Sequence, residues 1–518
     1  MILRTLLAST LALGALAAPA RAAAPAQTAA PAQTAGRQAA VKWQECPAYS
    51  DAVLRSLGVP EERFPDFRRL YARTECGTLA VPQDYADPGG KQITVAFTRL
   101  KAADQAHRLG SLAVNPGGPG GSGYLMPIEL VLGGMKLDQR HDLIGLDPRG
   151  VGYSTKVGCP SPERERPRPG PVTEEQARNV HAQVVAANKA CAATDPGFIG
   201  QLTAANAARD LDRVRAALGE RTLSFLGVSW GTWFGAVYRN LFPERVRRMW
   251  LDSVAITVPR MDVFTDVRAD ATARDFQRFA AWVAKQDATY GFGDTTAEVV
   301  AALTRLRERY DADPVTFTDI DFTVDGRAIA EAAGQPSPAW RDVAQVLKEL
   351  VTATGPEAPP TLKRLAGGGE DGPPPAGAPE RGNAVARNAY FCNEDPGPRS
   401  FEVFWRDYQA RLARHPVTGE ATAFVSPCAG WPLPPQPTRL RRSGGSLMLS
   451  GHPHETPSPY QWTLDMRAAV GGTVVTVDDD VHGSALRTPD CIAKIVAYFE
   501  TGRRVRTCEG VPLPAATS

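Results

Sequence analysis

The chain has 518 residues, of which 58 are Lys or Arg and 56 are Asp or Glu, so its formal net charge is +2. This length leaves room for roughly two to four domains, or for one domain with a large insertion. The near balance of charge argues against nucleic acid or an anionic membrane as a partner, and it favours a small molecule or a peptide.

Residues 1–22 are expected to form a secretory signal peptide. They contain an early cation, Arg4, an apolar stretch to about Ala18, and small residues at Ala20 and Ala22, which is the pattern of a cleaved export signal. The stretch is too short for a stable membrane anchor. Residues 23–40, with the near-repeat APAQTA, are predicted to be a disordered leader or pro-segment. We therefore expect a soluble protein that is secreted to the extracellular space.

Short apolar runs and helical patterns alternate in the first half of the mature chain. The runs, each closed by Gly, Pro or Asp, predict strands, and apolar residues three and four apart predict helices between them. The predicted strands lie near residues 92–102, 110–116, 141–150, 222–229 and 247–254. This alternation predicts an α/β fold, a mostly parallel sheet with helices on both faces.

Two further strands are predicted only after a long interval, near residues 446 and 472. The interval, residues 255–440, is mostly helical in pattern and includes the Gly/Pro-rich stretch AGGGEDGPPPAGAPERG. We therefore expect one α/β core, formed by residues 41–254 and 441–518 and interrupted by a mainly helical cap at 255–440.

Eight cysteines, an even number, fit an oxidising compartment. No CxxC pair occurs, which argues against zinc or thioredoxin chemistry. Sequence alone does not fix the connectivity. Closing four local couples is the simplest arrangement, and buried free thiols are the alternative. The couples are Cys46 with Cys76, Cys159 with Cys191, Cys392 with Cys428, and Cys491 with Cys508.

The segment GVSWG, residues 227–231, has the pattern G-x-S-x-G between a predicted strand and a predicted helix. Its two glycines allow a sharp turn that lifts the serine side chain above the carboxyl edge of the sheet. A nucleophile elbow requires that context. It makes Ser229 the candidate nucleophile, rather than one more serine in a chain rich in small residues.

An acyl-transfer serine also needs backbone donors for the oxyanion. Upstream, a predicted strand runs into NPGGPGGSG at residues 115–123, where glycines let amides approach a substrate oxygen. The amides of Gly118 and Trp230 are the candidate pair. A phosphate loop or a plain flexible turn is the alternative, and it is disfavoured because the P-loop lysine is missing.

His482, in DDDVHGSAL after the last predicted strand, is the candidate general base, because this fold places its histidine on that loop. His452 and His454 form an H-x-H pair that could bind a metal, but no third ligand is evident. The remaining histidines lie outside the expected late loop, at His107, His141, His181 and His415.

The acid that orients the histidine should follow the penultimate strand. After SLMLSG the chain continues HPHETPSPYQW, so Glu455 is the candidate acid. Asp465 lies in a predicted helix. The aspartates at 478–480 are so close to His482 that they are better explained as solvated loop charges.

Eight motifs in order carry a resemblance: NPGGPGGSG, DLIGLDPRGVGYS, FLGVSWGT, FPERVRRMWLDSV, FCNEDP, CAGWP, DVHG and CIAKIVAYFETGRRVRTC. Over about residues 40–510 the chain resembles the secreted tripeptidyl aminopeptidases, relatives of proline iminopeptidase in the α/β-hydrolase superfamily. Two motifs depart from the pattern. NPGGPG stands where proline iminopeptidases have H-G-G-P-G, and E-T-P-S-P-Y puts Glu455 where D-x-x-T-P-Y has aspartate. The resemblance also supports the couples at 392 with 428 and 491 with 508.

The resemblance implies a secreted serine exopeptidase that releases short peptides, tripeptides by the family's name, from free N-termini. It implies a cap that limits the site to the end of a peptide. An acidic group should then pair with the substrate ammonium, and Glu394 in FCNED is the candidate; a solvated loop carboxylate is the alternative. No metal or organic cofactor is expected, and we expect a monomer.

Two other classes stay open. An esterase or another small-molecule serine hydrolase would use the same residues, because a fold does not fix the substrate. A binding protein that has lost the chemistry would fail to react at Ser229 with a fluorophosphonate. Loss of peptide amide cleavage on acetylation of the N-terminus would favour the exopeptidase.

Overall fold

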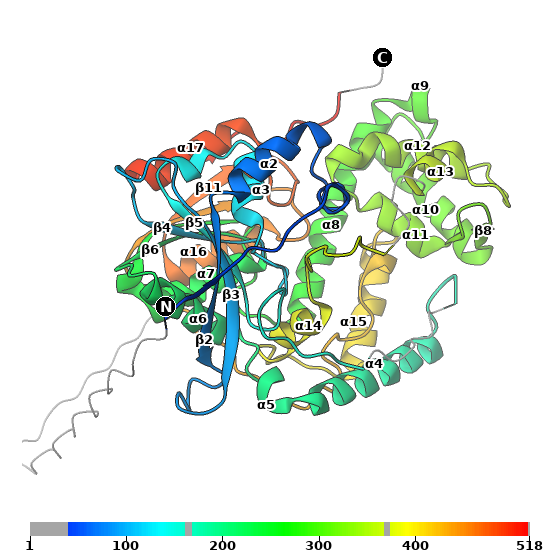
Figure 1. Ribbon diagram of the computed structural model, residues 1–518. Helices are drawn as coiled ribbons and strands as arrows, with labels where there is room; N and C mark the ends of the chain where they lie inside the picture. Colours follow the sequence, from blue (N-terminus) through cyan, green and yellow to red (C-terminus); the bar gives the residue numbers. More distant parts are fainter. Residues whose placement is uncertain (1–39, 161–167, 367–372, 516–518) are drawn as a thin grey trace, which may run out of the picture. The chain divides into compact units, whose positions relative to one another are not determined.

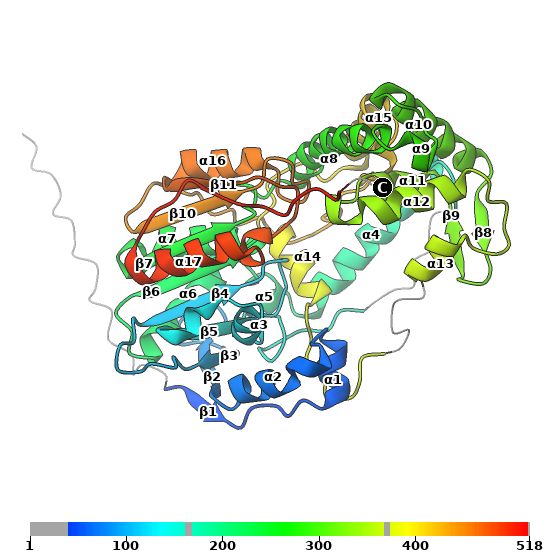
Figure 2. The same cartoon turned by 90° about the horizontal axis from the view of Figure 1, so that it is seen from above.

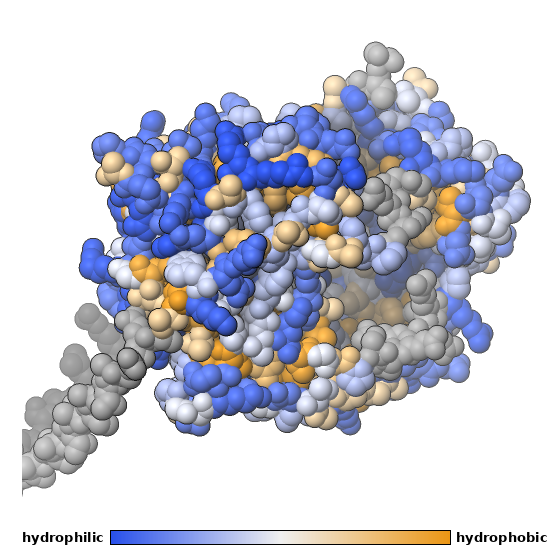
Figure 3. Space-filling model, viewed as in Figure 1, coloured by the Kyte–Doolittle hydropathy of each residue, from blue (hydrophilic) through white to orange (hydrophobic). Residues whose placement is uncertain are grey.

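The computed structural model describes residues 40–160, 168–366 and 373–515. The expected signal peptide and all but the last residue of the expected leader lie outside these ranges. Of the helices in the described ranges, none is both long enough and apolar enough to cross a membrane. The face shown in Figure 3 is covered mainly by hydrophilic residues, with apolar residues in small scattered groups.

A ten-stranded sheet forms the centre of the fold, in the order β1-β2-β3-β5-β4-β6-β7-β10-β11-β12 (Figure 1). The pairs from β5 to β12 are parallel, and the pairs β1–β2, β2–β3 and β3–β5 are antiparallel. The predicted α/β fold is confirmed, and β10 and β11, the two late strands, complete the sheet beside β7. The strands are β1 Lys42–Gln44, β2 Thr74–Pro82, β3 Gln92–Leu100, β4 Ser111–Asn115, β5 Asp142–Asp147, β6 Leu223–Val228, β7 Val246–Asp252, β10 Ser446–Gly451, β11 Thr473–Val477 and β12 Thr507–Cys508.

The central strands are buried along their whole length because helices cover both faces of the sheet. Alternate side chains enter two different cores: Phe225 and Leu251 pack against α6, α7 and α16, whereas Leu226 and Trp250 pack against α2, α3 and α17. Figure 1 shows α2, α3 and α17 on one side of the sheet and α6 and α7 on the other, and Figure 2 looks onto the side of α17. The helices are α2 Phe64–Tyr71, α3 Met126–Leu132, α6 Ala204–Ala217, α7 Trp230–Leu241, α16 Tyr460–Val470 and α17 Pro489–Thr501.

Between β7 and β10 the chain forms a mainly helical region, which we call the cap (residues 255–440). Part of it has a core of its own, in which Phe279, Trp282 and Trp340 pack on one another. Its elements are α8 Met261–Ala284, α9 Asp287–Tyr290, α10 Thr296–Ala312, β8 Val315–Phe317, β9 Phe322–Val324, α11 Gly326–Ala333, α12 Trp340–Leu350, α13 Pro360–Ala366, α14 Ala384–Cys392 and α15 Phe401–Arg414.

One helix from the first part of the chain packs with the cap. This is α4 (Glu174–Thr194), which begins at a capping box on Thr173 and lies beside α15. Its Ala177 shares a small core with Phe401 and Tyr408 of α15. A single boundary at residue 254 therefore misses α4, because the sequence of this helix does not indicate which element it packs against. Two short helices complete the first part of the chain: α1 (Asp51–Ser56) lies between β1 and β2, and α5 (Pro196–Ile199) follows α4.

The cysteines form the four expected local disulfides, 46–76, 159–191, 392–428 and 491–508. The first fixes the segment after β1 to β2, and the second ties the loop after β5 to α4. The third joins the end of α14 to the segment after α15, and the fourth joins α17 to β12. The sequence separations are 17 to 36 residues, so in the chain-entropy account each disulfide stabilises the fold by about 3 to 4 kcal/mol.

Candidate active site

Ser229 lies on the turn from β6 to α7, and its backbone has φ 59° and ψ −131°. A positive φ is strained for a residue with a side chain, and such strain persists only where the surroundings enforce it. The Ser229 N–H donates to the Asp252 carbonyl oxygen at 3.0 Å, and the Thr232 hydroxyl donates to the Ser229 carbonyl oxygen at 2.7 Å. The turn thus holds the Ser229 side chain at the wall of a cavity.

The two glycines of G-x-S-x-G are required by close backbone approach. A methyl group added to Gly227 would lie 2.5 Å from the carbonyl oxygen of Gly231, and one added to Gly231 would lie 2.6 Å from the carbonyl oxygen of Asn115. No side chain fits at either position without moving the backbone. The sharp strand-to-helix turn therefore requires glycine at both positions of the G-x-S-x-G pattern.

The glycine-rich loop after β4 packs directly on this turn. A methyl group on Gly117, whose φ is +90°, would lie 2.4 Å from the Val228 carbonyl oxygen and 2.9 Å from the Trp230 nitrogen. Gly118, Ser229 and Trp230 line the same cavity. Because Trp230 is the first residue of α7, its N–H has no acceptor within the helix. The structure thus brings the two candidate oxyanion donors to the candidate nucleophile.

The loops after β10 and β11 bring the candidate acid and base together. His482 Nδ1 is hydrogen-bonded to Glu455 Oε1, and this oxygen also accepts from the Ser458 N–H at 3.1 Å. Glu455 is buried, whereas the His482 side chain is 33% exposed. A buried carboxylate that holds Nδ1 fixes the orientation of the imidazole and directs Nε2 outward.

The loop that carries His482 is fixed to the turn that carries Ser229. The Gly483 N–H donates to Ser253 Oγ at 2.8 Å, and Ser253 follows the residue whose carbonyl receives the Ser229 N–H. A methyl group on Gly483 would lie 3.3 Å from Val228 Cγ1. Neighbours of His482 thus contact neighbours of Ser229, so the two side chains belong to one site.

Two of the remaining candidate acids are buried structural anions, so the prediction that they are solvated loop charges is wrong. Asp479 Oδ1 pairs with His452 Nδ1 at 2.6 Å, and Asp480 accepts hydrogen bonds from the Ser337 N–H and hydroxyl. Asp465 and Asp478 are exposed. Among the sequence candidates, Glu455 is the acid that contacts His482.

His452 is the centre of a buried charge cluster. Its imidazole lies between Asp479 and Asp252, the latter at 3.2 Å, and Nε2 lies 4.0 Å from the second oxygen of Glu455. Burial alone would lower the pKa of His452, but the carboxylates of Asp252, Asp479 and Glu455 raise it well above its usual value. The residue considered for an H-x-H metal pair is instead a cation that neutralises buried carboxylates, one of them the candidate acid.

This cluster predicts a pH dependence of stability. A histidine whose pKa is raised on folding stabilises the fold fully below about pH 6.5, its pKa when unfolded, and the stabilisation is lost as the pH rises through the folded pKa. We therefore expect the free energy of unfolding to fall above about pH 6.5, and to fall less steeply in His452→Gln. Urea unfolding between pH 6 and 9 measures this. Exposed His107 supplies the control, His107→Gln, and equal slopes in all three proteins would contradict the assignment.

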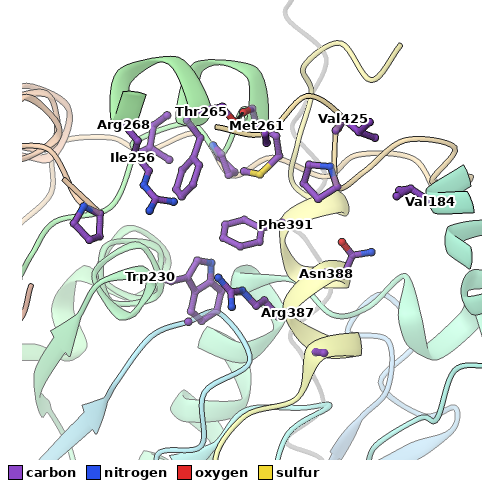
Figure 4. Close-up of a pocket in the computed structure, with 18 of the residues that line it drawn as sticks. Val184, Trp230, Ile256, Met261, Thr265, Arg268, Arg387, Asn388, Phe391 and Val425 are labelled. Atoms are coloured by element: carbon purple, nitrogen blue, oxygen red, sulfur yellow. Dashed lines mark hydrogen bonds between the residues drawn. The ribbon is translucent and has the colours of Figure 1, made fainter. Parts of the chain in front are cut away.

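The cavity next to Ser229 has a volume of about 1340 Å³ and is lined from both the core and the cap. Figure 4 shows Trp230 on the core side, Met261, Thr265 and Arg268 on α8 opposite, and Phe391 of α14 between them. Helix α4 contributes Val184 to another side. Among the described residues that line the cavity, the ionisable side chains are Arg268 and Arg387, and none is acidic.

Glu394 does not reach this cavity. It is fully buried, Oε2 accepts from the Trp233 indole N–H at 2.7 Å, and Oε1 accepts from the Ala204 N–H at 2.6 Å. Burial raises the pKa of Glu394 to about 7, although both hydrogen bonds oppose the rise. Both predictions for Glu394 are therefore wrong: it does not face a substrate ammonium in the cavity, and it is not a solvated loop carboxylate. The side chain joins the end of α14 to the starts of α6 and α7.

Replacing Glu394 by alanine is expected to lower the free energy of unfolding by about 2 to 4 kcal/mol, because two buried N–H donors lose their acceptor. We expect KM for peptide amides to change less than about twofold in the folded variant, since no substrate contact is removed. Urea unfolding and steady-state kinetics measure the two quantities. Glu402→Ala, at a 70% exposed side chain of the cap, is the control. A KM increase at unchanged stability would restore the substrate-binding role.

Comparison with known proteins gives two family matches. Residues 111–318 match the family described as alpha/beta hydrolase fold, and residues 415–508 match the family described as TAP-like protein. The chain is 32% identical to the tripeptidyl aminopeptidase of Streptomyces lividans, over 96% of this chain and 94% of that one. It is 30% identical to serine protease Hip1 of Mycobacterium tuberculosis, over 82% and 85%. It is 28% identical to carboxylesterase B of Mycobacterium tuberculosis, over 85% and 88%.

Proposed function

The chain belongs to the tripeptidyl aminopeptidase family of serine hydrolases with the α/β-hydrolase fold, and on that premise we propose that it removes tripeptides from the free N-termini of peptides. One observation carries the proposal: the strained Ser229, the glycine loop and the hydrogen-bonded His482–Glu455 pair meet beside a cavity that the cap covers. The family match supports a peptide as the substrate.

The proposed reaction is acyl transfer in two steps. Glu455 accepts a hydrogen bond from the Nδ1–H of His482, which leaves Nε2 unprotonated and able to take the hydroxyl proton of Ser229. Ser229 Oγ attacks the scissile carbonyl carbon, and the amides of Gly118 and Trp230 stabilise the negative oxygen. His482 gives the proton to the leaving amine as the C–N bond breaks. Water, deprotonated by His482, then hydrolyses the acyl-enzyme and frees Ser229.

The cap supports action at a chain end. Helices α8, α14 and α4 line the same cavity as Ser229, so a peptide meets the serine with one end enclosed. The described lining offers no carboxylate to the substrate ammonium. Neutral oxygens and aromatic faces, such as the side chains of Asn388 and Phe391, therefore receive it. We also propose that the protein acts outside the cell, because the first 22 residues have the export pattern and the four disulfides suit an oxidising compartment.

A panel of aminoacyl, dipeptidyl and tripeptidyl chromogenic amides, each with a free and an acetylated N-terminus, tests the proposal. We expect the free tripeptidyl amide to be cleaved fastest, with acetylation lowering kcat/KM by at least about tenfold through one lost hydrogen-bonded charge. The Ser229→Ala variant is the negative control for hydrolysis that does not depend on Ser229. Hydrolysis of simple esters without cleavage of any amide would replace the proposal by the esterase, which the similarity to a carboxylesterase favours.

A further inference from the structure

We propose that Arg268 and Arg387 form a carboxylate-binding subsite in the cavity, so that the enzyme selects peptides with a carboxylate close to the scissile bond. The inference rests on the proposed peptidase function and adds a substrate class to it. The carboxylate can belong to an acidic side chain of the released peptide or to the free C-terminus of a short substrate. Both sources present the same group to the two guanidinium groups.

The first observation is that neither guanidinium is neutralised. Within the described ranges, neither Arg268 nor Arg387 forms a salt bridge or a side-chain hydrogen bond. Three other cap arginines are paired with carboxylates: Arg278 with Asp275, Arg307 with Asp311 and Glu420, and Arg411 with Asp266. Two unpaired cations on the wall of one cavity, with no acidic side chain among its described lining, favour an anionic ligand.

Two buried donors at the cavity, on Arg268 and Trp230, have no acceptor among the described residues. Arg268 stacks on the Phe264 ring with 5.0 Å between Cζ and the ring centroid, and its buried Nε has no hydrogen-bond partner in the described part of the chain. The indole N–H of Trp230, a residue only 4% exposed, is also buried without a partner among the described residues. Figure 4 shows Trp230 next to Arg387, with Arg268 on the opposite, α8 side of the cavity. Buried donors without acceptors are costly unless a ligand supplies the acceptor.

The third observation is the mutual repulsion of the two cations. Burial lowers the pKa of Arg268, the charge of Arg387 lowers it further, and Glu455 opposes the shift. The two guanidinium groups are therefore close enough to repel each other, and Arg268 is close enough to the candidate acid to sense its charge. A carboxylate bound between the arginines would remove this repulsion.

The subsite lies beside the reacting groups. A methyl group on Gly120, two residues after Gly118 in the glycine loop, would lie 2.9 Å from the backbone nitrogen of Arg387 and 3.1 Å from its Cβ. Arg387 is thus fixed to the oxyanion side of the site, and Arg268 lies toward Glu455. An anion held by both arginines lies within a few residues of the scissile bond, so the subsite selects residues that flank the cleaved bond.

The test compares substrates that differ only in a carboxylate. The first arm uses tripeptidyl 4-nitroanilides of alanine with Asp or Asn, and Glu or Gln, at each of the three positions. The second arm uses tetra-alanine with a free or an amidated C-terminus. We expect the carboxylate member of at least one pair to have a kcat/KM about 10- to 100-fold higher, the range of a hydrogen bond to a charged group. The arm that shows the preference identifies the source of the carboxylate.

Arg268→Gln and Arg387→Gln should each reduce this preference to less than about threefold and leave cleavage of the neutral tri-alanyl anilide within about threefold of wild type. Arg406→Gln, at a 71% exposed arginine of α15, should keep the preference. Equal rates within every pair, or a preference that survives both variants, would overturn the subsite.

The neutral tri-alanyl anilide separates this test from the peptidase proposal. Its cleavage by the wild-type enzyme reports the proposed function, whatever the pairs show. If the enzyme hydrolyses only esters, monoesters of succinic acid compared with esters of butyric acid test the same arginines. In that case a preference that Arg268→Gln and Arg387→Gln abolish would support the subsite, and equal rates would overturn it.

Discussion

Replacement of Ser229 by alanine is expected to lower kcat/KM by about 10⁴- to 10⁶-fold, because the oxyanion donors and the binding cavity alone leave only weak catalysis. The substitution removes the only atom proposed to form the acyl bond. Alanine retains a Cβ in the same positive-φ backbone, so the strain of the turn is unchanged. We expect the free energy of unfolding to stay within about 1 kcal/mol of wild type.

Ser229→Gly separates chemistry from strain at the same position. Glycine adopts φ near 59° without steric cost, so this variant should be as inactive as Ser229→Ala. Loss of the backbone strain should raise the free energy of unfolding by about 1 to 3 kcal/mol. The larger entropy of the unfolded chain with glycine should partly offset this gain. Hydrolysis of the free tripeptidyl amide, reaction with a fluorophosphonate and urea unfolding supply the three measurements. More than about 1% residual activity in both variants would place the nucleophile elsewhere.

The parts of the site that could be predicted from sequence lie next to strand ends. Parallel strands deliver the residues after their carboxyl ends to one edge of the sheet, so Ser229 after β6 and the loops after β10 and β11 had to converge. The central strands were predictable for a related reason: they are continuous apolar runs. The edge strands β1 and β12 were missed because they are only three and two residues long, and β2 was missed because its sequence begins with polar residues and contains Gly77. Pairing with a neighbour rather than propensity makes these segments strands.

What the sequence did not reveal depends on contacts between distant segments. Asp479 and Asp480 follow a strand like ordinary loop charges, and only the packing of His452 and Ser337 against them shows that they are buried. Glu394 was assigned to the substrate because it is acidic and lies in a motif, yet its partners are about 160 and 190 residues away in the chain. Whether each of these carboxylates is structural or binds substrate is therefore decided by the hydrogen-bond donors that the fold brings to it.

Arg268 and Arg387 show the same limit for cations. Each lies in a cap helix, and no sequence spacing separates a paired arginine from an unpaired one. The difference is visible only when the acidic neighbours of every cap arginine are known. The two arginines of the proposed subsite thus lie in the cap, which is also the region where sequence patterns were least informative.

Glu455→Gln is expected to lower kcat by about 10³- to 10⁴-fold, with a much smaller change in KM, as for a triad acid changed to its amide. Both orientations of the glutamine amide are unfavourable. With the NH₂ group toward His482, Nδ1 must become the acceptor, which leaves Nε2 protonated and unable to take the Ser229 proton. With the NH₂ group on the other side, it faces the His452 imidazolium, 4.0 Å from the present position of Oε2. In either case the imidazolium formed during the reaction loses its anionic partner.

Two further variants decide whether Glu455 is the acid. Asp465→Asn, at an exposed residue of α16, should leave kcat unchanged. Asp479→Asn should reduce the free energy of unfolding through the loss of its pair with His452, and should affect kcat less than Glu455→Gln does. All three variants replace a carboxylate by its amide, so the chemical change is the same in each. Differences in kcat among them therefore reflect where the carboxylate lies in the structure. A larger loss of kcat in Asp479→Asn than in Glu455→Gln, at equal stability, would transfer the role of the acid to the loop that carries His482.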